Sequence, residues 1–431
     1  MKTVFHGVEG RINGTEGCFN GIKEKVRKNR YGSRKPKICE CLKWGGKMIA
    51  RVVQLQKNGF NATLVSSAVE ALRRGALVVL PTETVYGIAV RADDAAAVEH
   101  LMAAKNRSEK NPFTLAFAGV DRILPYVPYM SVKAERLARR CFPGPITIVM
   151  TADFPESAIY QLPENSRQYV MPEDSIGVRV PRHDFTQAVL READFPVALT
   201  SANLAGQVDS TSALEVVRAI GDKVDLIFDD GDSILKEPST VLQFARNSNV
   251  YRILRQGAVS CKQLDRFAQP MILFVCTGNT CRSPMAEALA KDILARKRGV
   301  PLERFEETGI QVYSAGTCAT DFSPASSEAR HAMQALGLDL SAHISHPVTG
   351  KLLDYADLIY TMTPTHRLQI LSAMPEIARK VFTLARTSGG ISDPYGSSFE
   401  VYETCARQIR DELEKEFSSA DFAQIVFPED I

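Results

Sequence analysis

The chain has 431 residues, of which 45% are hydrophobic and 24% are charged. These values are typical of globular proteins, and a chain of this length is expected to contain two domains. No apolar run approaches the ~18 residues that a membrane span needs, and the first residues contain no apolar signal-peptide core. Nine cysteines are too few and too scattered for a secreted disulfide framework, so we expect a reducing cytoplasm.

Residues 1–47 differ from the remainder in charge. They hold 12 of the 52 Lys and Arg and 4 of the 50 Asp and Glu, which places +8 in this segment and −6 in the remainder. The segment is rich in Gly and Lys and lacks periodicity, which predicts a basic, disordered extension. Its cysteines match no common zinc-ligand spacing, so no metal site is predicted. Globular patterning begins at Met48, which suggests that translation starts there as an alternative. Peptides from residues 1–47, found by mass spectrometry of the native protein, would exclude this alternative.

Helical and strand patterns alternate between about residues 62 and 260. Helical spacing of apolar residues predicts helices at 63–77 and 93–107. Short apolar runs predict strands at 76–87, 113–118, 146–151, 176–181, 196–203, 226–231, 239–244 and 250–257. We therefore expect a mixed α/β sheet domain over residues 48–262, followed by a polar linker at 263–270.

A new alternation of strands and helices begins at residue 271. Strands are predicted at 271–276, 310–316 and 357–362. Helices are predicted from Ser283 to Arg298 and at 326–337, 365–374 and 400–417. Units of about 30 residues in this order favour a doubly wound parallel sheet over residues 271–431.

The segment Cys276-Thr-Gly-Asn-Thr-Cys-Arg282-Ser-Pro lies between a buried strand and a helix. Ser283 is a suitable N-cap and Pro284 a suitable first helical residue, so the loop's N–H groups are expected to point inward and bind a tetrahedral dianion. Arg282 can add two hydrogen bonds to phosphate oxygens. The same donors favour a thiolate at Cys276, which predicts phosphoryl transfer through a phosphocysteine without a metal.

The leaving group of such a reaction needs a proton, and Asp393 in the segment Ser-Asp-Pro-Tyr-Gly-Ser-Ser can supply it. The same carboxylate can then act as the base for the attacking water. Asp393 is therefore the expected general acid, and Cys276 and Arg282 complete the predicted catalytic set.

Residues 271–431 resemble the low-molecular-weight protein phosphatase family, whose motifs match Cys276–Glu287, Ser314–Thr317 and Asp393–Tyr395. The resemblance implies that Cys276 is the nucleophile, Arg282 the phosphate clamp and Asp393 the general acid. It also implies a phosphate loop with supporting side chains, formed by Thr277, Gly278, Asn279, Thr280, Cys281 and Ser283. Under oxidation, Cys281 could form a protective disulfide with Cys276.

Thr280 bears on the substrate of this site. Tyrosine-directed members of the family usually have a branched apolar residue here, whereas members resembling bacterial protein-arginine phosphatases have threonine. A hydroxyl offers a guanidinium a hydrogen-bond acceptor, so phosphoarginine is preferred over phosphotyrosine. Two alternatives stay open. In the first, Thr280 only packs against its neighbours, as a valine would. In the second, the domain reduces arsenate, a reaction that needs further paired cysteines near the site, and Cys318 and Cys405 do not form such a pair in sequence.

The N-terminal domain carries polar groups at the ends of several predicted strands, as a ligand crevice requires. Lys105 and Arg107 supply two cations for a triphosphate. Uncharged hydrogen-bonding groups are supplied by Ser201, Asn203, Ser239 and Thr240.

The segments Pro-Thr-Glu-Thr-Val-Tyr-Gly (81–87), Lys105-x-Arg107, Pro-Gly-Pro-Ile-Thr (143–147), Ser-Ala-Asn (201–203) and Ser239-Thr240 follow one another in the chain. Together they resemble the YrdC-like threonylcarbamoyl-AMP synthase family over about 200 residues. The resemblance implies condensation of L-threonine, bicarbonate and ATP, with Mg²⁺ accompanying ATP, and delivery of the product to the tRNA-modification machinery. It places ATP against Lys105, Arg107, Asn111, Thr147, Ser201, Asn203 and Arg255. It places threonine against Thr84 and Ser239, with Arg179 nearby. Ala116 departs from the family pattern, since many members have a histidine there that is expected to touch threonine.

The expected protein is thus a bifunctional enzyme that acts on threonine, bicarbonate and phosphoproteins. The alternative is a phosphatase whose other half binds nucleotide or double-stranded RNA as a sensing module. In a third interpretation the two activities are fused without being coupled.

Overall fold

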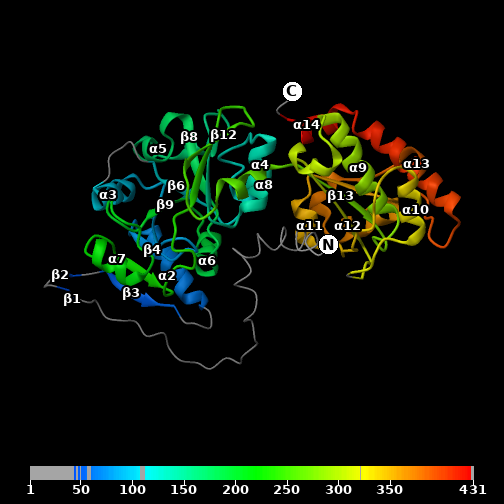
Figure 1. Cartoon of the computed structure of the whole chain (residues 1–431). Coiled ribbons are helices and arrows are strands. Elements are labelled where there is room, and N and C mark those ends of the chain that lie inside the picture. The colour runs from blue at the N-terminus through cyan, green and yellow to red at the C-terminus, as the bar shows by residue number, and fades with distance from the viewer. Residues whose placement is uncertain are drawn as a thin grey trace. The chain divides into compact units, whose positions relative to one another are not determined.

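The computed structural model describes residues 50–55, 60–106, 112–320 and 322–428, and the backbone of a short antiparallel pair formed by β1 (Lys43–Trp44) and β2 (Lys47–Met48). Apart from that pair, the predicted basic extension lies outside the described residues. The described chain divides between Leu264 and Asp265 into two compact units, called here the N-terminal and C-terminal units. Figure 1 shows the elements of each unit.

The N-terminal unit is built on a ten-stranded sheet with the strand order β12, β11, β7, β8, β6, β9, β5, β4, β10, β3. Parallel and antiparallel pairs both occur, which confirms the predicted mixed sheet. The strands are β3 (Arg51–Gln54), β4 (Val78–Leu80), β5 (Gly87–Arg91), β6 (Thr114–Ala116), β7 (Ile146–Thr151), β8 (Ser175–Arg179), β9 (Val197–Ser201), β10 (Leu226–Asp229), β11 (Thr240–Phe244) and β12 (Tyr251–Arg255).

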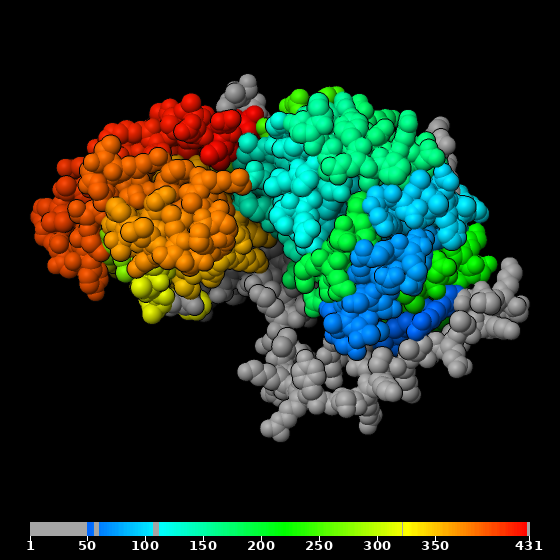
Figure 2. Space-filling model, turned by 180° about the vertical axis from the view of Figure 1, so that it is seen from behind, coloured from blue at the N-terminus to red at the C-terminus, as the bar shows by residue number. Residues whose placement is uncertain are grey.

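Several helices of this unit begin at side-chain caps, and the helices cover the sheet. Asn61 accepts a hydrogen bond from Leu64 N at the start of α2, and Asp94 accepts one from Ala97 N at the start of α3. Figure 2 shows α2 and α3 (blue) on the surface of this unit. The helices are α2 (Ala62–Arg73), α3 (Ala95–Lys105), α4 (Val132–Cys141), α5 (Glu164–Val170), α6 (Asp184–Glu192) and α7 (Ala213–Ile220).

The C-terminal unit has a four-stranded sheet in the order β14, β13, β15, β16, and every pair is parallel. The strands are β13 (Met271–Cys276), β14 (Gln311–Gly316), β15 (Leu358–Thr361) and β16 (Val381–Thr383). The helices are α9 (Arg282–Arg298), α10 (Ser327–Ala335), α11 (Gly350–Tyr355), α12 (Pro364–Ala373), α13 (Phe399–Glu416) and α14 (Ala420–Val426).

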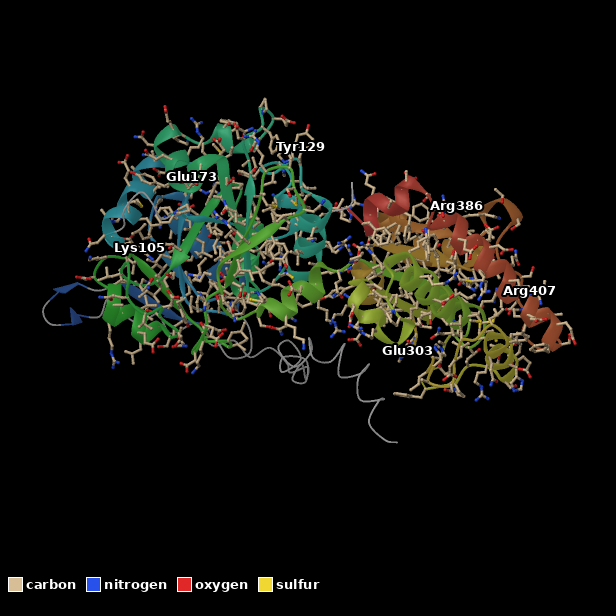
Figure 3. The ribbon with its side chains drawn as sticks, turned by 45° about the horizontal axis from the view of Figure 1, so that its top comes forward. Lys105, Tyr129, Glu173, Glu303, Arg386 and Arg407 are labelled. Carbon is tan, nitrogen blue, oxygen red and sulfur yellow. The ribbon has the colours of Figure 1, made fainter. Side chains whose placement is uncertain are left out.

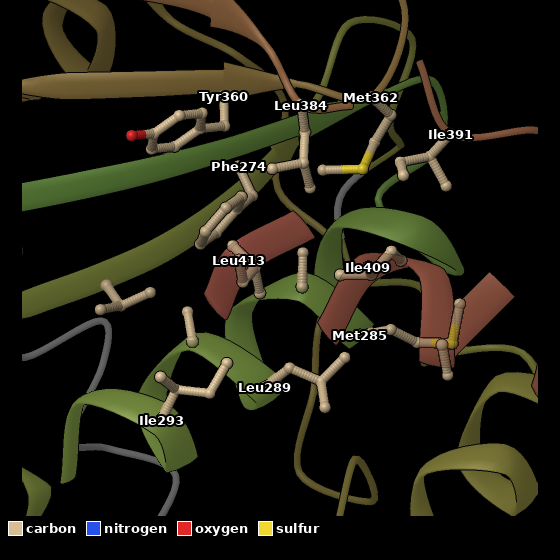
Figure 4. Packing of buried hydrophobic residues seen from close by; sticks show 14 of the residues in the cluster. Phe274, Met285, Leu289, Ile293, Tyr360, Met362, Leu384, Ile391, Ile409 and Leu413 are labelled. Carbon is tan, nitrogen blue, oxygen red and sulfur yellow. The ribbon is translucent and has the colours of Figure 1, made fainter. Parts of the chain in front are cut away.

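Buried apolar clusters lie on both faces of this parallel sheet, as predicted for a doubly wound fold. One cluster joins Phe274 and Tyr360 of the sheet to Leu289 of α9 and Leu413 of α13, and Figure 4 shows this packing. The other cluster joins Leu273 and neighbouring strand residues to α11 and α12. From β13 the chain continues to β14 on one side of it and then to β15 on the other side, so the strand order reverses at β13. The crevice beyond the carboxyl end of such a strand is a usual place for a ligand site.

Two of the differences from the predicted element boundaries bear on the linker and on the phosphate loop. Helix α8 (Cys261–Ala268) occupies most of the predicted linker at 263–270. Its start carries a capping box, in which Ser260 N donates to Gln263 Oε1 at 3.0 Å and Gln263 N donates to Ser260 Oγ at 3.4 Å. The second difference is that α9 begins at Arg282, with Cys281 at the N-cap position, so the predicted capping role of Ser283 is wrong.

None of the helices in the described part of the chain is long and apolar enough to cross a membrane.

Candidate active sites

The phosphate loop of the C-terminal unit connects the end of β13 to the start of α9. Asn279, at the centre of the loop, has a left-handed backbone with φ of 55°. This conformation turns its N–H toward the thiol, and Asn279 N donates to Cys276 Sγ at 3.2 Å. Ser283 Oγ lies 3.0 Å from the same sulfur. The hydroxyl that we expected to cap α9 therefore contacts the predicted nucleophile instead.

A chain of buried and half-buried polar groups braces Asn279 in this conformation; we call Asn279, Ser314, Glu287 and His343 the loop brace. Asn279 Nδ2 donates to Ser314 Oγ at 2.9 Å, and Ser314 Oγ donates to Glu287 Oε2 at 2.6 Å. His343 Nε2 lies 2.7 Å from the carbonyl oxygen of Asn279. The brace fixes both the amide side chain and the backbone of the loop's central residue.

Arg282 and Asp393 form an ion pair at the mouth of the loop, through Arg282 Nη2 and Asp393 Oδ2. The guanidinium also donates from Nη1 to the carbonyl oxygen of Ile391 at 3.2 Å. Arg282 Nε is buried and has no hydrogen-bond partner in the described chain. The side chain of Asp393 is 49% exposed, whereas that of Arg282 is 4% exposed. A fixed cation and a solvent-accessible carboxylate therefore stand together beside Cys276.

Thr280 and Cys281 complete the loop. The Thr280 hydroxyl is half-buried and has one weak contact, at 3.7 Å to Cys281 Sγ. Cys281 Sγ lies 3.3 Å from Tyr402 Oη and 3.4 Å from Ser326 Oγ. The disulfide between Cys281 and Cys276 stays a prediction, and all cysteines of the described residues are free thiols.

No pattern in the sequence indicated a role for His366, which contacts the loop at Thr277. His366 Nε2 lies 2.9 Å from Thr277 Oγ1, and His366 Nδ1 lies 2.8 Å from Thr363 Oγ1, the N-cap of α12. Burial lowers the pKa of His366 below its usual 6.5, Arg282 lowers it further and Asp393 opposes both. The ring is therefore neutral near pH 7.

His366→Gln is expected to make the C-terminal unit less sensitive to mild acid. The unfolded wild-type chain takes up a proton on His366 below about pH 6.5 that the folded state resists, so stability falls as the pH drops. Glutamine keeps a hydrogen-bonding side chain but takes up no proton. Urea unfolding of both proteins at pH values on either side of the histidine pKa would measure the effect. An equal loss of stability in acid would contradict it.

The N-terminal unit contains a cavity of about 480 Å³. Lining residues on β8 recur at Ser175, Gly177 and Arg179, and those on β11 recur at Val241 and Gln243. Since alternate residues of a strand share one face, the cavity lies over a face of the sheet and not only beyond the strand ends. Of the predicted ligand-binding residues, it brings together Thr147, Arg179, Ser201, Ser239 and Arg255.

Arg179 is fixed within this cavity by a buried ion pair. Its Nη2 donates to Glu83 Oε1 at 2.9 Å and to Thr84 Oγ1 at 2.7 Å. The other oxygen of Glu83 accepts from Arg182 N at 2.9 Å. Arg179 Nε is buried without a partner in the described chain. Glu83 had no predicted role, although it lies inside the Pro-Thr-Glu-Thr segment that marked the site.

Lys105 ends α3 and reaches the end of β9 (Figure 3). Its Nζ donates to the carbonyl oxygen of Ser201 at 2.5 Å and to Asn203 Oδ1 at 3.2 Å. Ser201 Oγ also donates to Asn203 Oδ1, at 2.6 Å. These three predicted ATP ligands form one connected group. Arg107 and Asn111, which were predicted with them, lie outside the described residues.

The remaining predicted ligand-binding residues, Thr147, Ser239 and Arg255, contact one another at the start of β11. Thr147 Oγ1 lies 2.9 Å from Ser239 Oγ, and Arg255 Nη2 donates to the carbonyl oxygen of Ser239 at 2.9 Å. Thr240 is different, because its hydroxyl donates to Val259 O at 2.7 Å. Its expected role as a ligand-binding group is therefore replaced by a structural one.

Ala116, the departure from the family pattern, is buried in an apolar cluster. It pairs with Arg179 in the register of β6 and β8, so the missing histidine would stand beside that arginine.

Two family models match the chain. One, with the description "Telomere recombination", matches residues 70–257, and one for low molecular weight phosphotyrosine protein phosphatases matches residues 271–423. A protein-arginine-phosphatase of Bacillus subtilis is 42% identical over 150 residues, which are 33% of this chain and 89% of the relative. A threonylcarbamoyl-AMP synthase of Vibrio vulnificus is 31% identical over 195 residues, 45% of this chain and 98% of the relative.

A threonylcarbamoyl-AMP synthase of Pyrococcus abyssi is also 31% identical over 195 residues, 45% of this chain. The chain spans about half, 54%, of the length of that relative.

The fold and the two sites thus define a chain with two enzyme-family domains. It belongs to the threonylcarbamoyl-AMP synthase family through its N-terminal unit and to the low-molecular-weight protein phosphatase family through its C-terminal unit. Both resemblances inferred from the sequence are confirmed.

Proposed function

We propose that the C-terminal unit is a cysteine-dependent protein phosphatase. The observation that carries this proposal is the convergence of the Asn279 N–H and the Ser283 hydroxyl on Cys276 Sγ, with Arg282 and Asp393 beside them. The buried Nε–H of Arg282 would donate to a phosphate oxygen bound in the loop.

In this mechanism the thiolate of Cys276 forms a bond to phosphorus while the bond from phosphorus to the leaving group breaks. Protonated Asp393 gives its proton to that leaving group, and a phosphocysteine results. Water then attacks phosphorus, Asp393 takes a proton from the water, and the sulfur leaves as a thiolate together with inorganic phosphate. Because the nucleophile must stay reduced, a reducing cytoplasm is the location we propose.

We infer that the substrate is phosphoarginine in proteins. Thr280 is half-buried, and its hydroxyl has no strong partner among the described residues, so it is available to accept from a guanidinium. The Bacillus subtilis relative, a protein-arginine-phosphatase, supports this choice over phosphotyrosine.

Thr280→Val, which keeps the shape of the side chain and loses the hydroxyl, is expected to lower kcat/KM for phosphoarginine about tenfold and to leave phosphotyrosine hydrolysis unchanged. Thr280→Ser is the matched control, since it keeps the hydroxyl. Phosphate release from the two substrates, side by side, measures the effect. A wild-type preference for phosphotyrosine, or an unchanged preference in Thr280→Val, would make Thr280 a packing residue.

We propose that the N-terminal unit forms threonylcarbamoyl-AMP from L-threonine, bicarbonate and ATP. Three arginines and two carboxylates line its cavity, and Lys105 lies close by, so the site has the cations that a triphosphate requires. The amine of threonine would combine with bicarbonate, with loss of water, to give threonylcarbamate. An oxygen of its carbamate group would then attack the α-phosphorus of ATP and release pyrophosphate, so the protein's role is orientation and charge neutralisation. Mg²⁺ would arrive with ATP, and the product would pass to the tRNA-modification machinery.

Pyrophosphate release by the purified full-length protein is expected only when ATP, threonine and bicarbonate are all present. Reactions that lack one of the three substrates in turn are the controls. ATP binding without threonine-dependent turnover would instead favour the alternative, in which this unit is a sensing module for nucleotide or RNA. An assay with free L-serine as the substrate in place of L-threonine tests whether Ala116 relaxes the amino-acid specificity.

A further inference from the structure

A second cavity, of about 520 Å³, lies in the C-terminal unit between α9, β14 and the loops that flank them. We call it the brace cavity, because Glu287, Ser314 and His343 of the loop brace line it. Its volume is in the range of small-molecule sites. Its apolar lining is formed mainly by Leu302, Phe305, Tyr313, Leu338, Leu340 and Ile344.

The polar side of the brace cavity offers hydrogen-bond acceptors. Burial alone would raise the pKa of Glu287, but Lys291 and the hydrogen bond from Ser314 outweigh it and lower the pKa, so the carboxylate is ionised. Its oxygens accept from Lys291 Nζ at 2.5 Å and from Ser314 Oγ at 2.6 Å, and its side chain is 19% exposed. A carboxylate has about four acceptor positions, so capacity remains for a further donor.

His343 adds a second acceptor. Its Nε2 contacts a carbonyl oxygen, which can only accept, so Nε2 carries the proton. Burial lowers the pKa of His343, and the ring is therefore neutral near pH 7 with a bare Nδ1. No described residue forms a hydrogen bond to this Nδ1.

The charges of the lining favour a cation over an anion. Among the described residues that line the cavity are two carboxylates, Glu287 and Asp339, and one ammonium, Lys291. Glu287 and Lys291 pair with each other, and both oxygens of Asp339 accept from Ser341. The lining therefore carries one net negative charge, that of the exposed Asp339, in addition to a mainly apolar wall and the acceptors on Glu287 and His343.

We propose that the brace cavity binds a small cation with an apolar body, such as an aromatic amidine or amine, and that its occupancy slows the phosphatase. The cationic end would donate to Glu287 and His343, and the apolar body would lie against the aromatic and aliphatic wall. The binding site stands independently of the phosphatase assignment, whereas the regulatory effect rests on the proposed function.

The regulatory effect follows from hydrogen bonds that the ligand and the brace share. Ser314 donates to Glu287 and accepts from Asn279, and Asn279 N donates to Cys276 Sγ. A cation at Glu287 draws electron density away from the carboxylate that accepts from Ser314, and so weakens the hydrogen bond from Ser314 even though both donors can be bound at once. Loosening that contact loosens Asn279, and with it the loop conformation that supports the thiolate. A fall in kcat with little change in KM is therefore expected, because the ligand does not occupy the phosphate loop.

Three probes of nearly equal shape test the proposal on the full-length protein: benzamidine (cationic), benzamide (neutral) and benzoate (anionic). Calorimetric titration and saturation-transfer NMR measure binding, and hydrolysis of p-nitrophenyl phosphate measures the rate. Benzamidine is expected to bind saturably and at least about tenfold more tightly than benzoate, and to lower kcat. Equal binding of the three probes would overturn the cation site.

Ala342→Trp provides the matched variant, since Ala342 is exposed, lines the cavity and takes no part in the brace. Tryptophan would fill the space and weaken benzamidine binding at least about tenfold, whereas Ala342→Ser would leave it unchanged. Unchanged binding to Ala342→Trp would overturn the location, and binding without a fall in kcat would overturn the regulatory effect. A wild-type protein that binds benzamidine but hydrolyses no phosphate ester would contradict the phosphatase function and leave the cation site standing.

Discussion

Cys276→Ser is expected to lower phosphate release by a factor of more than about 10⁴, with no change in the fold of the C-terminal unit. Serine keeps the size of the side chain and its contacts with Asn279 N and Ser283 Oγ. A hydroxyl, however, is a far weaker nucleophile than a thiolate at neutral pH. Phosphate release under single-turnover conditions, with intact mass of the acid-quenched protein, measures both the rate and the covalent intermediate.

Cys318→Ser is the control for this substitution. Cys318 is an exposed thiol whose backbone N donates to the carbonyl oxygen of Thr277 at 2.9 Å, so it lies next to the loop without contacting the predicted nucleophile. The phosphatase activity of Cys318→Ser should equal that of the wild type. Wild-type turnover in Cys276→Ser would remove the thiolate mechanism altogether.

Arg179→Met is expected to destabilise the N-terminal unit by about 3–5 kcal/mol and to abolish synthase turnover. Glu83 and Arg179 have side chains that are 4% and 9% exposed, so methionine would leave a buried carboxylate without its cation. Hydrogen exchange of the full-length protein measures the stability of this unit. The C-terminal unit of the same chain is the internal control, since its exchange should not change.

The double variant Glu83→Gln with Arg179→Met separates charge from packing. If the loss of stability comes from an uncompensated charge, the double variant should be more stable than Arg179→Met alone. A double variant that is as unstable as the single one would show that packing, and not the ion pair, holds Arg179.

The local parts of both folds and sites could be predicted from the sequence. The segment from Met271 to Arg298 carries its own signals for a buried strand, a glycine turn and a helix, so the phosphate loop was placed correctly. The start of α9 was misplaced because a serine next to a proline is a strong capping signal. In the structure, a contact with the sulfur of Cys276 determines where that hydroxyl lies instead.

The long-range parts could not be predicted. His366 is 89 residues from Thr277, and Arg179 is 96 residues from Glu83, so no spacing in the sequence connects them. Strand β5 was missed because the single strand predicted at 76–87 runs through the Pro-Thr-Glu-Thr turn, whereas the structure ends β4 at Leu80 and begins an antiparallel strand at Gly87. The sequence shows which polar groups are present, whereas the pairs they form depend on tertiary packing.

The ion pair between Arg282 and Asp393 has a consequence for the order of events in a turnover. In the free protein this contact holds Asp393 Oδ2 against Arg282 Nη2, so that the oxygen faces the guanidinium and not a leaving group. In the mechanism proposed above, a phosphate group entering the loop takes the guanidinium for itself and releases the carboxylate. Substrate arrival therefore frees Asp393 to turn toward the leaving group, and the acid stays out of place until there is a group for it to protonate.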